Sequence, residues 1–223
     1  MTNSIRKDFE EGSRNFSGKP GDNYWQLETD FTIEASLDPS TQTITGSEKI
    51  LVHNNSKDDL NAIVLRLDHN IFRGDVPRGS SVPAENTEGM IITALKVAGE
   101  SVDLNAASQR RNDPPALSVR GLQSTVATIT LVNPIKAGTT AELEIDWHTK
   151  LPGGDNGRGH RMTQRFDSTL FQPTQWFPRL AKYDDLRGWE TSLYLGPAEF
   201  HNNFGRYDVS LIVPAGWIVT GTG

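Results

Sequence analysis

The chain has 223 residues, with 22 Lys and Arg against 28 Asp and Glu, which gives a formal net charge of −6. A nucleic-acid-binding protein needs a basic face to neutralise phosphates, so this acidic chain is a poor candidate for that class. Hydrophobic residues make up 35% of the chain, which supports a folded core. No apolar run approaches the roughly 18 residues that a membrane span needs. Cysteine is absent, which excludes disulfides, cysteine nucleophiles and thiolate metal ligands.

The first residues, MTNSIRKDFEEGSRNF, are charged throughout and contain no apolar stretch of the kind found in a signal peptide. The compartment stays open between cytoplasm and periplasm. We expect one short helix within residues 4–16. It would belong to an N-terminal extension covering residues 1–23.

Apolar and polar residues alternate in several segments, as in a strand with one buried and one exposed face. The clearest segments are 31–37, 141–147 and 207–213, and further strands are expected at 43–53, 62–67, 90–97, 116–119, 125–132, 163–171 and 191–195. About ten strands with little helix predict an all-β fold. Its form would be an antiparallel saddle-like β-sandwich or one large twisted sheet. We expect residues 24–223 to form a single domain.

Familiar catalytic motifs are missing from the sequence. It contains no HExxH zinc motif, no GxSxG elbow, no phosphate loop and no dinucleotide fingerprint. Asp184 and Asp185 could suggest a metal-ligand pair, but adjacent residues of an extended chain point apart. Asp-Asp before Leu-Arg-Gly is more often a turn. We therefore expect neither a metal site nor a complete catalytic site within this chain.

Residues 171–190, FQPTQWFPRLAKYDDLRGWE, are rich in aromatic, amide and arginine side chains. One interpretation is a packed corner between strand and loop, with the aromatics in the core. The other is a binding surface, because Gln172 and Gln175 each offer a donor and an acceptor that suit a peptide end or a sugar. Pro173 breaks the extended geometry and could let both amides point to one side.

Three stretches, taken in order, resemble the N-terminal domain of the gluzincin zinc aminopeptidases, the family of aminopeptidase N and leukotriene hydrolase. The first runs from Tyr24 through LDP and TGSE to LRLDHN. In the second, residues 171–190, Phe171-Gln172-Pro173-Thr174 followed by Asp184-Asp185 resembles the family pattern FEPT…DE. The third, residues 199–223, contains YDVSLIVP and TGTG. The likeness covers nearly the whole chain from residue 24 onward.

This resemblance implies a non-catalytic β domain, with zinc bound by HExxH and a downstream Glu in a catalytic domain after residue 223. It implies that the chain itself holds no cofactor and that its partners are its own catalytic domain and the N-terminus of a peptide substrate. The family's N-terminal domain lends a Gln or Glu to that peptide end. Gln172 occupies the position by spacing, and Gln175 is the close rival. Trp176, Phe177 and Leu180 are expected on the interdomain surface.

A function of another class stays open from the sequence alone. A stand-alone carbohydrate-binding or adhesion sandwich would use Trp176, Trp189 or Trp217 as a stacking platform. The reading frame beyond Gly223 distinguishes the two hypotheses. An HExxH motif further along favours the peptidase domain, and a stop codon or a different domain favours the binding module.

Overall fold

A computed structural model describes residues 1–79, 85–105, 116–153, 163–198 and 200–221. The strands are β1 (Glu28–Asp38), β2 (Thr43–His53), β3 (Leu60–Arg66), β4 (Met90–Val97), β5 (Glu100–Ser101), β6 (Ser118–Arg120), β7 (Val126–Ile135), β8 (Thr140–Lys150), β9 (Arg179–Leu180), β10 (Tyr183–Asp184), β11 (Gly188–Trp189) and β12 (Tyr207–Ile212). The helices of these ranges are α1 (Asn3–Glu10) and the 3-10 helix η1 (Asp68–Phe72). Neither helix is long and apolar enough to cross a membrane. The predicted all-β fold with little helix is confirmed.

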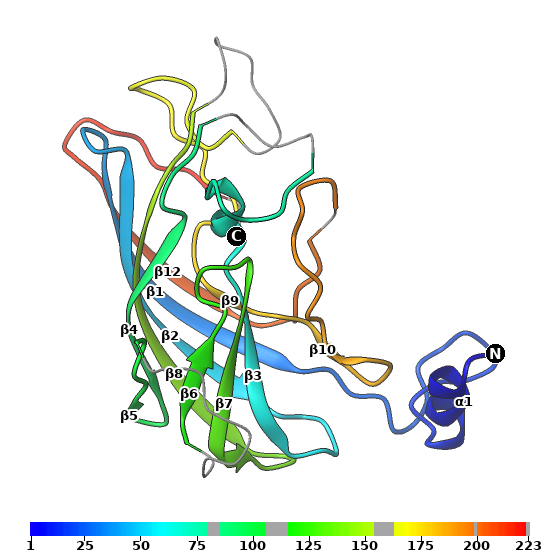
Figure 1. Cartoon of the computed structure of the whole chain (residues 1–223). Coiled ribbons are helices and arrows are strands. Elements are labelled where there is room, and N and C mark those ends of the chain that lie inside the picture. Colours follow the sequence, from blue (N-terminus) through cyan, green and yellow to red (C-terminus); the bar gives the residue numbers. More distant parts are fainter. Residues whose placement is uncertain (80–84, 106–115, 154–162, 199, 222–223) are drawn as a thin grey trace.

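The strands form two sheets that pack against each other (Figure 1). The larger sheet has the order β12-β1-β2-β8-β4-β5, and the smaller has the order β6-β7-β3-β9. β10 and β11 form a separate hairpin. The sequence predicts about ten strands, whereas the described ranges contain twelve. The strands without a prediction, β5, β9, β10 and β11, have two residues each and are too short to show an alternating pattern.

The core lies between the two sheets. β1 and β2 alternate buried and exposed residues along most of their length, so each contributes one apolar face to the core. Buried residues of the larger sheet include Ile33, Ile50 and Leu143, and those of the smaller sheet include Ile63 and Ile129. Burial of each such side chain contributes about 1.5–3 kcal/mol, and this term holds the sheets together.

β12 departs from the predicted antiparallel arrangement. It pairs with β1 in parallel, with Phe31 opposite Tyr207 and Ser36 opposite Ile212. The larger sheet is therefore mixed. A parallel neighbour requires a long connection, and residues 39–206 supply it. The alternation in residues 207–213 predicts a strand but holds no information on its direction.

Two predicted strands, at residues 163–171 and 191–195, are wrong. In the first segment, Asp167 Oδ1 accepts hydrogen bonds from the amides of Thr169 and Leu170, which turns the chain back on itself. Only isolated bridges form there, including one between Arg165 and Phe171. In the second segment, the Tyr194 amide donates to the Thr125 hydroxyl at 2.9 Å and joins no ladder.

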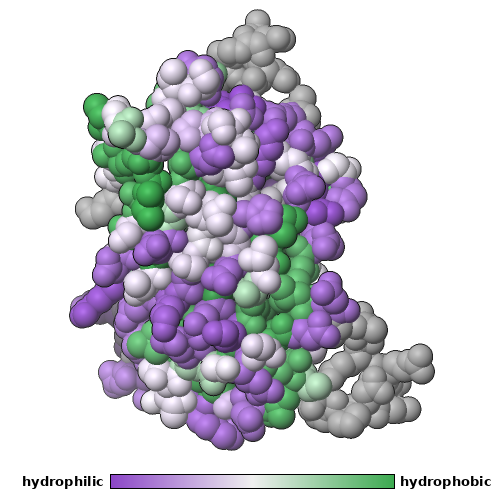
Figure 2. Space-filling view, turned by 90° about the vertical axis from the view of Figure 1, so that its left-hand side faces the viewer, coloured by the Kyte–Doolittle hydropathy of each residue, from purple (hydrophilic) through white to green (hydrophobic). Residues whose placement is uncertain are grey.

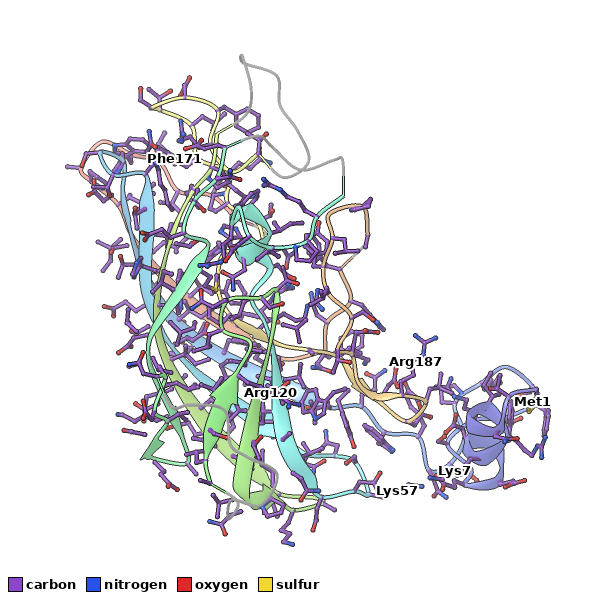
Figure 3. The ribbon with its side chains drawn as sticks, in the orientation of Figure 1. Met1, Lys7, Lys57, Arg120, Phe171 and Arg187 are labelled. Atoms are coloured by element: carbon purple, nitrogen blue, oxygen red, sulfur yellow. The ribbon has the colours of Figure 1, made fainter. Side chains whose placement is uncertain are left out.

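Residues 1–23 form a small unit beside the sandwich, at the right of Figure 1. α1 accounts for the short helix predicted here, and its N-cap is Thr2. Asp185 holds the unit, because its carboxylate accepts hydrogen bonds from Ser13 Oγ and Arg14 Nη2, both at 2.7 Å. Lys57 pairs with Glu11, and Figure 3 shows Lys57 and Arg187 on the side of the sandwich that faces this unit.

Candidate functional site

The two glutamines that the sequence singles out lie in the connection leading into β9. Gln172 is exposed and Gln175 is half-buried. Gln175 has a backbone φ of 54°, in the left-handed region that few residues other than glycine adopt. The unusual backbone conformation therefore lies two residues after Pro173. Such a conformation costs about 1–3 kcal/mol and persists only where the surroundings hold it.

Thr174, between the two glutamines, is held by the side chain of Gln164. The Thr174 amide donates to Gln164 Oε1 at 2.6 Å, and Gln164 Nε2 donates to the Thr174 hydroxyl at 3.2 Å. Gln164 is fully buried. The backbone N–H of Gln172 also donates to the backbone carbonyl of Gln164 at 2.9 Å, and this bond joins the two segments of chain. One buried residue thus fixes two polar groups of Thr174.

The carbonyl of Thr174 is held by a second buried side chain, His69. Nε2 of His69 lies 2.9 Å from Thr174 O, and Nδ1 lies 3.0 Å from Thr149 Oγ1. A carbonyl oxygen can only accept, so Nε2 carries the proton. Thr149 Oγ1 also lies 3.0 Å from the Gly89 carbonyl oxygen, so its single proton can serve either that oxygen or Nδ1 of the neutral ring. Burial lowers the pKa of His69 to about 4, so the ring is neutral at pH 7.

The 3-10 helix η1 presents His69 and buries its neighbours Asp68 and Asn70 as well. Asp68 accepts from Arg66 Nη2 at 3.0 Å and forms a close ion pair with Arg179 on β9. Asn70 Oδ1 accepts from the Met90 amide at 2.8 Å. Each buried polar group in this turn therefore has a partner, as interior polar groups require. The turn ties β3, β4 and β9 together and supports the glutamine connection through His69.

Five aromatic side chains form a continuous row from the core to the edge strand. Ring centroids are 5.6 Å apart for Trp147 and Trp176, 5.0 Å for Trp176 and Phe177, 5.8 Å for Phe177 and Phe31, and 4.8 Å for Phe31 and Tyr207. These separations are typical of favourable aromatic pairs. The row begins at the buried Trp147 and ends at Tyr207 on β12, which is 47% exposed.

β12 continues the apolar side of the larger sheet past the covered core. Tyr207, Val209 and Leu211 lie opposite buried residues of β1 in the parallel register, so they face the same side. Yet Val209 is 41% and Leu211 is 44% exposed. Together with the half-buried Trp176 and Phe177 they form a surface that we call the edge face. The part of the chain that the structure describes leaves this face uncovered.

Leu180, predicted on the interdomain surface with Trp176 and Phe177, lies elsewhere. It is 2% exposed and belongs to the core. The reason is that β9 pairs with β3, with Leu180 opposite Leu65, and this pairing turns the side chain inward. Trp176 and Phe177 precede β9 and keep part of their surface exposed.

Glu48 on β2 is a buried carboxylate in the core. It is 3% exposed, and neither of its oxygens has a hydrogen-bond partner among the described residues. Burial raises the pKa of Glu48 well above its usual range, and the Arg179 guanidinium opposes this rise. Burial also raises the pKa of Tyr207, with Arg179 lowering it and Glu48 raising it further. The three groups therefore lie within electrostatic reach of one another beside the edge face.

Two shallow hollows lie on the surface, and neither is lined by Gln172 or Gln175. One, of about 420 Å³, lies on the outer face of the larger sheet over Gly46 and Asp146. Figure 2 shows that this side of the molecule mixes hydrophilic and neutral residues with bands of hydrophobic ones. The other, of about 520 Å³, lies beside Arg73 and His148. Both hollows are open to solvent and therefore lack the enclosure typical of a small-molecule site.

The described residues bring no three His, Asp or Glu side chains together in a way that could hold a metal ion. Asp184 and Asp185 have structural partners instead. Asp184 Oδ1 accepts from the amides of Leu186 at 3.0 Å and Arg187 at 2.8 Å, which makes the turn that the sequence favoured here. Asp185 binds the N-terminal unit.

The three tryptophans of the alternative binding hypothesis do not form a shared platform. Trp176, Trp189 and Trp217 are all half-buried. Each packs on a different aromatic side chain: Trp176 on Trp147, Trp189 on Tyr183 and Trp217 on Phe171, which is labelled in Figure 3. A stacking site for a sugar needs an accessible ring face, and these contacts do not favour one.

No protein-family model matches the chain, and no curated protein matches it. Among solved structures, the chain is similar to an M1 zinc metallopeptidase from Deinococcus radiodurans, at 16% identity over 64% of this chain and 24% of that chain, with a TM-score of 0.35. A mutant of that enzyme bound to a Tyr-Ser-Ala substrate gives the same identity and TM-score over 25% of its chain. A two-domain M1 zinc metallopeptidase mutant bound to L-arginine is 15% identical over 59% of this chain and 22% of that chain, with a TM-score of 0.34. The chain thus spans about a quarter of the length of these proteins.

Three residues of the site, Gln164, His69 and Glu48, were not identified from the sequence. Gln164 and His69 act on the backbone of Thr174, which no side-chain pattern reveals. The sequence does contain an indication of Glu48, because this residue occupies an inward position between Gly46 and Ile50 in the alternation of β2. A charged residue at an inward position of a strand pattern indicates a buried titratable group.

Proposed function

We propose that the chain is the non-catalytic N-terminal β domain of a zinc aminopeptidase. It would pack on the catalytic domain and offer Gln172 or Gln175 to the N-terminal end of a bound peptide. The zinc ion and the general base would belong to the catalytic domain, after residue 223. The ordered likeness of three sequence stretches to that family supports this proposal.

The edge face is the observation that carries the proposal. An apolar sheet surface with Tyr207, Val209 and Leu211 each more than 40% exposed is unusual for a face that meets only water. Interfaces between domains of one chain commonly bury about 600–1,500 Å². A catalytic domain seated on the edge face would cover these side chains together with Trp176 and Phe177.

The glutamine connection adjoins the edge face, so a domain seated there would also meet Gln172 and Gln175. An exopeptidase must set the distance from the free amine of its substrate to the scissile carbonyl. Fixed polar groups at the closed end of a cleft do this, and they lower the barrier by holding the substrate in reactive geometry. An amide carries no charge, so a carboxylate of the catalytic domain would have to bind the ammonium group.

The test uses the full-length protein that contains this chain. We expect about one zinc ion per molecule, hydrolysis of aminoacyl-coumarin substrates that a chelator abolishes and zinc restores, and no cleavage of the N-acetylated substrate. The 223-residue chain alone should show none of this activity. A full-length protein without zinc or peptidase activity would refute the proposal, and so would chelator-sensitive hydrolysis by the isolated chain.

A further inference from the structure

We infer that His69 and Gln164 are positioning residues that set the geometry of Gln172 and Gln175. This inference rests on the proposed function, since it assigns a role in the peptide contact proposed there. The two side chains bond Thr174, the residue that separates Pro173 from Gln175. They act through the backbone and need not touch the peptide.

Three hydrogen bonds fix three different groups of Thr174. Gln164 accepts from the backbone N–H of Thr174 at 2.6 Å and donates to its hydroxyl at 3.2 Å. His69 donates to the Thr174 carbonyl at 2.9 Å. Both side chains are fully buried, whereas Thr174 is exposed. A surface segment is thus held by interior groups, whose rotamers are locked by packing. The carbonyl held by His69 belongs to the peptide unit that leads directly into the left-handed Gln175.

The clamp requires a proton on Nε2 of the His69 ring, because Thr174 O can only accept. Nδ1 faces Thr149 Oγ1, whose single proton can go to Nδ1 or to the Gly89 carbonyl oxygen. The T-shaped packing of His69 against Phe72, with ring centroids 5.4 Å apart, keeps the ring from turning over freely. A protonated ring would also keep Nε2–H. The inference therefore depends on the tautomer, which can be measured without any mutation.

The experiment compares substitutions in the full-length protein. In His69→Gln the side-chain amide reaches the position of Nε2 and can still donate to Thr174 O. In His69→Asn the shorter amide reaches only the position of Nδ1. Gln164→Leu removes both bonds to Thr174 at similar volume. Asn54→Ala is the control. It removes two side-chain bonds to backbone carbonyls, one of them buried, and the acceptor for Ser56, at the other end of β2 and roughly 30 Å away.

We expect His69→Asn and Gln164→Leu to raise KM about tenfold, below the roughly hundredfold that a 1 Å misplacement can cost. His69→Gln should stay within about threefold of the unaltered protein, and Asn54→Ala should leave KM unchanged. In the unaltered protein, ¹⁵N chemical shifts should report the Nε2–H tautomer of His69. The Thr174 amide should exchange slowly with solvent, and this protection should be lost in Gln164→Leu.

The outcomes separate this inference from the proposed function. If Gln172→Ala and Gln175→Ala both leave kcat/KM unchanged, the peptide contact itself is wrong. If either glutamine substitution impairs kcat/KM while His69→Asn and Gln164→Leu behave like Asn54→Ala, the positioning role is wrong and the contact stands. The Nδ1–H tautomer, or a rapidly exchanging Thr174 amide, would overturn the clamp even if every substituted protein failed to fold.

Discussion

The ring of Phe177 lies 6.3 Å from the ring of Tyr207, edge to face. Phe177 belongs to the connection that carries the two glutamines, and Tyr207 opens the edge strand β12. The contact makes the edge face and the glutamine connection one continuous surface. A partner seated on β12 beside Tyr207 would therefore also meet Phe177, which follows the two glutamines in the chain.

Leu180 and Leu211 provide a matched test of which apolar residues are covered. Leu180→Ala should destabilise the isolated chain by about 2–5 kcal/mol, because it opens a cavity in the core. Leu211→Ala should cost about 1 kcal/mol or less, because Leu211 is 44% exposed. Urea unfolding followed by tryptophan fluorescence measures both. Equal costs in the isolated chain would mean that the edge face is already covered.

The same pair tests docking in the full-length protein. If a catalytic domain seals the edge face, the cost of Leu211→Ala should rise there by about 1–2 kcal/mol, since the side chain becomes fully buried. The cost of Leu180→Ala should stay the same. An unchanged cost of Leu211→Ala in the full-length protein would place the interdomain contact elsewhere.

The long strands could be predicted from the sequence because each has one buried and one exposed face. The range predicted for β2 matches the structure, and Gly46 within it has a visible reason. A Cβ at Gly46 would lie 2.6 Å from Cζ2 of Trp147, so the glycine makes room for the indole. The segments predicted wrongly as strands contain side chains that form hydrogen bonds with the backbone, such as Asp167. The alternation of apolar and polar residues gives no information on these bonds.

The candidate site was predictable only in its exposed part. Gln172 and Gln175 stand out as amides in an aromatic segment, but the His69 that supports them is 105 residues away from Thr174 in the sequence. The prediction that Leu180 lies on the surface is wrong because the pairing of β9 with β3 turns this side chain inward. β9 is too short to show an alternation from which that direction could be predicted. Tertiary contacts of this kind leave no local pattern.

Glu48 should make the stability of the chain fall as pH rises above 4.5. Its pKa in the folded chain lies above the unfolded value of 4.5, so the unfolded state loses its proton first and stability falls as pH rises past 4.5 toward the folded pKa. Glu48→Gln should remove this loss and gain about 1 kcal/mol or more at pH 7.5, with little gain at pH 4. Chemical unfolding at both pH values measures it. Glu34→Gln, on the exposed face of β1, is the control. A gain that does not change with pH would mean that Glu48 ionises normally.

His69 should have the opposite effect, making the stability of the chain fall as pH decreases into the acid range. Its pKa falls from 6.5 to about 4 on folding, so the stability it contributes is present above pH 6.5 and is lost as pH falls toward 4. The loss amounts to about 3 kcal/mol at 1.36 kcal/mol per pKa unit. His69→Gln cannot titrate, so its stability should approach that of the unaltered chain as pH falls from 7 to 4.5. A constant difference across this range would contradict a buried neutral His69.

Asp185 should control how firmly the N-terminal unit is attached. Asp185→Ala removes the acceptor for both Ser13 and Arg14 and leaves the two donors without it. Limited trypsin digestion should then cleave within residues 1–23 several times faster, while the sandwich stays intact. Asp22→Ala, at an exposed carboxylate of the same unit, keeps every Lys and Arg that trypsin needs and should not change the rate. Equal cleavage rates for the Asp185→Ala and unaltered chains would show that other contacts hold the unit.

The most direct test of the central claim is the kinetic effect of Gln172→Ala and Gln175→Ala in the full-length protein, measured together with Tm. Loss of a hydrogen bond to a charged peptide end costs about 1.5–3 kcal/mol. One of the two substitutions should therefore lower kcat/KM roughly ten- to hundredfold with Tm almost unchanged, and we expect Gln172 because it is exposed and fits the family spacing. A lowered Tm with unchanged kcat/KM in both variants would mean that the glutamines only support the loop, and the claim that this domain contributes to the active site would be wrong.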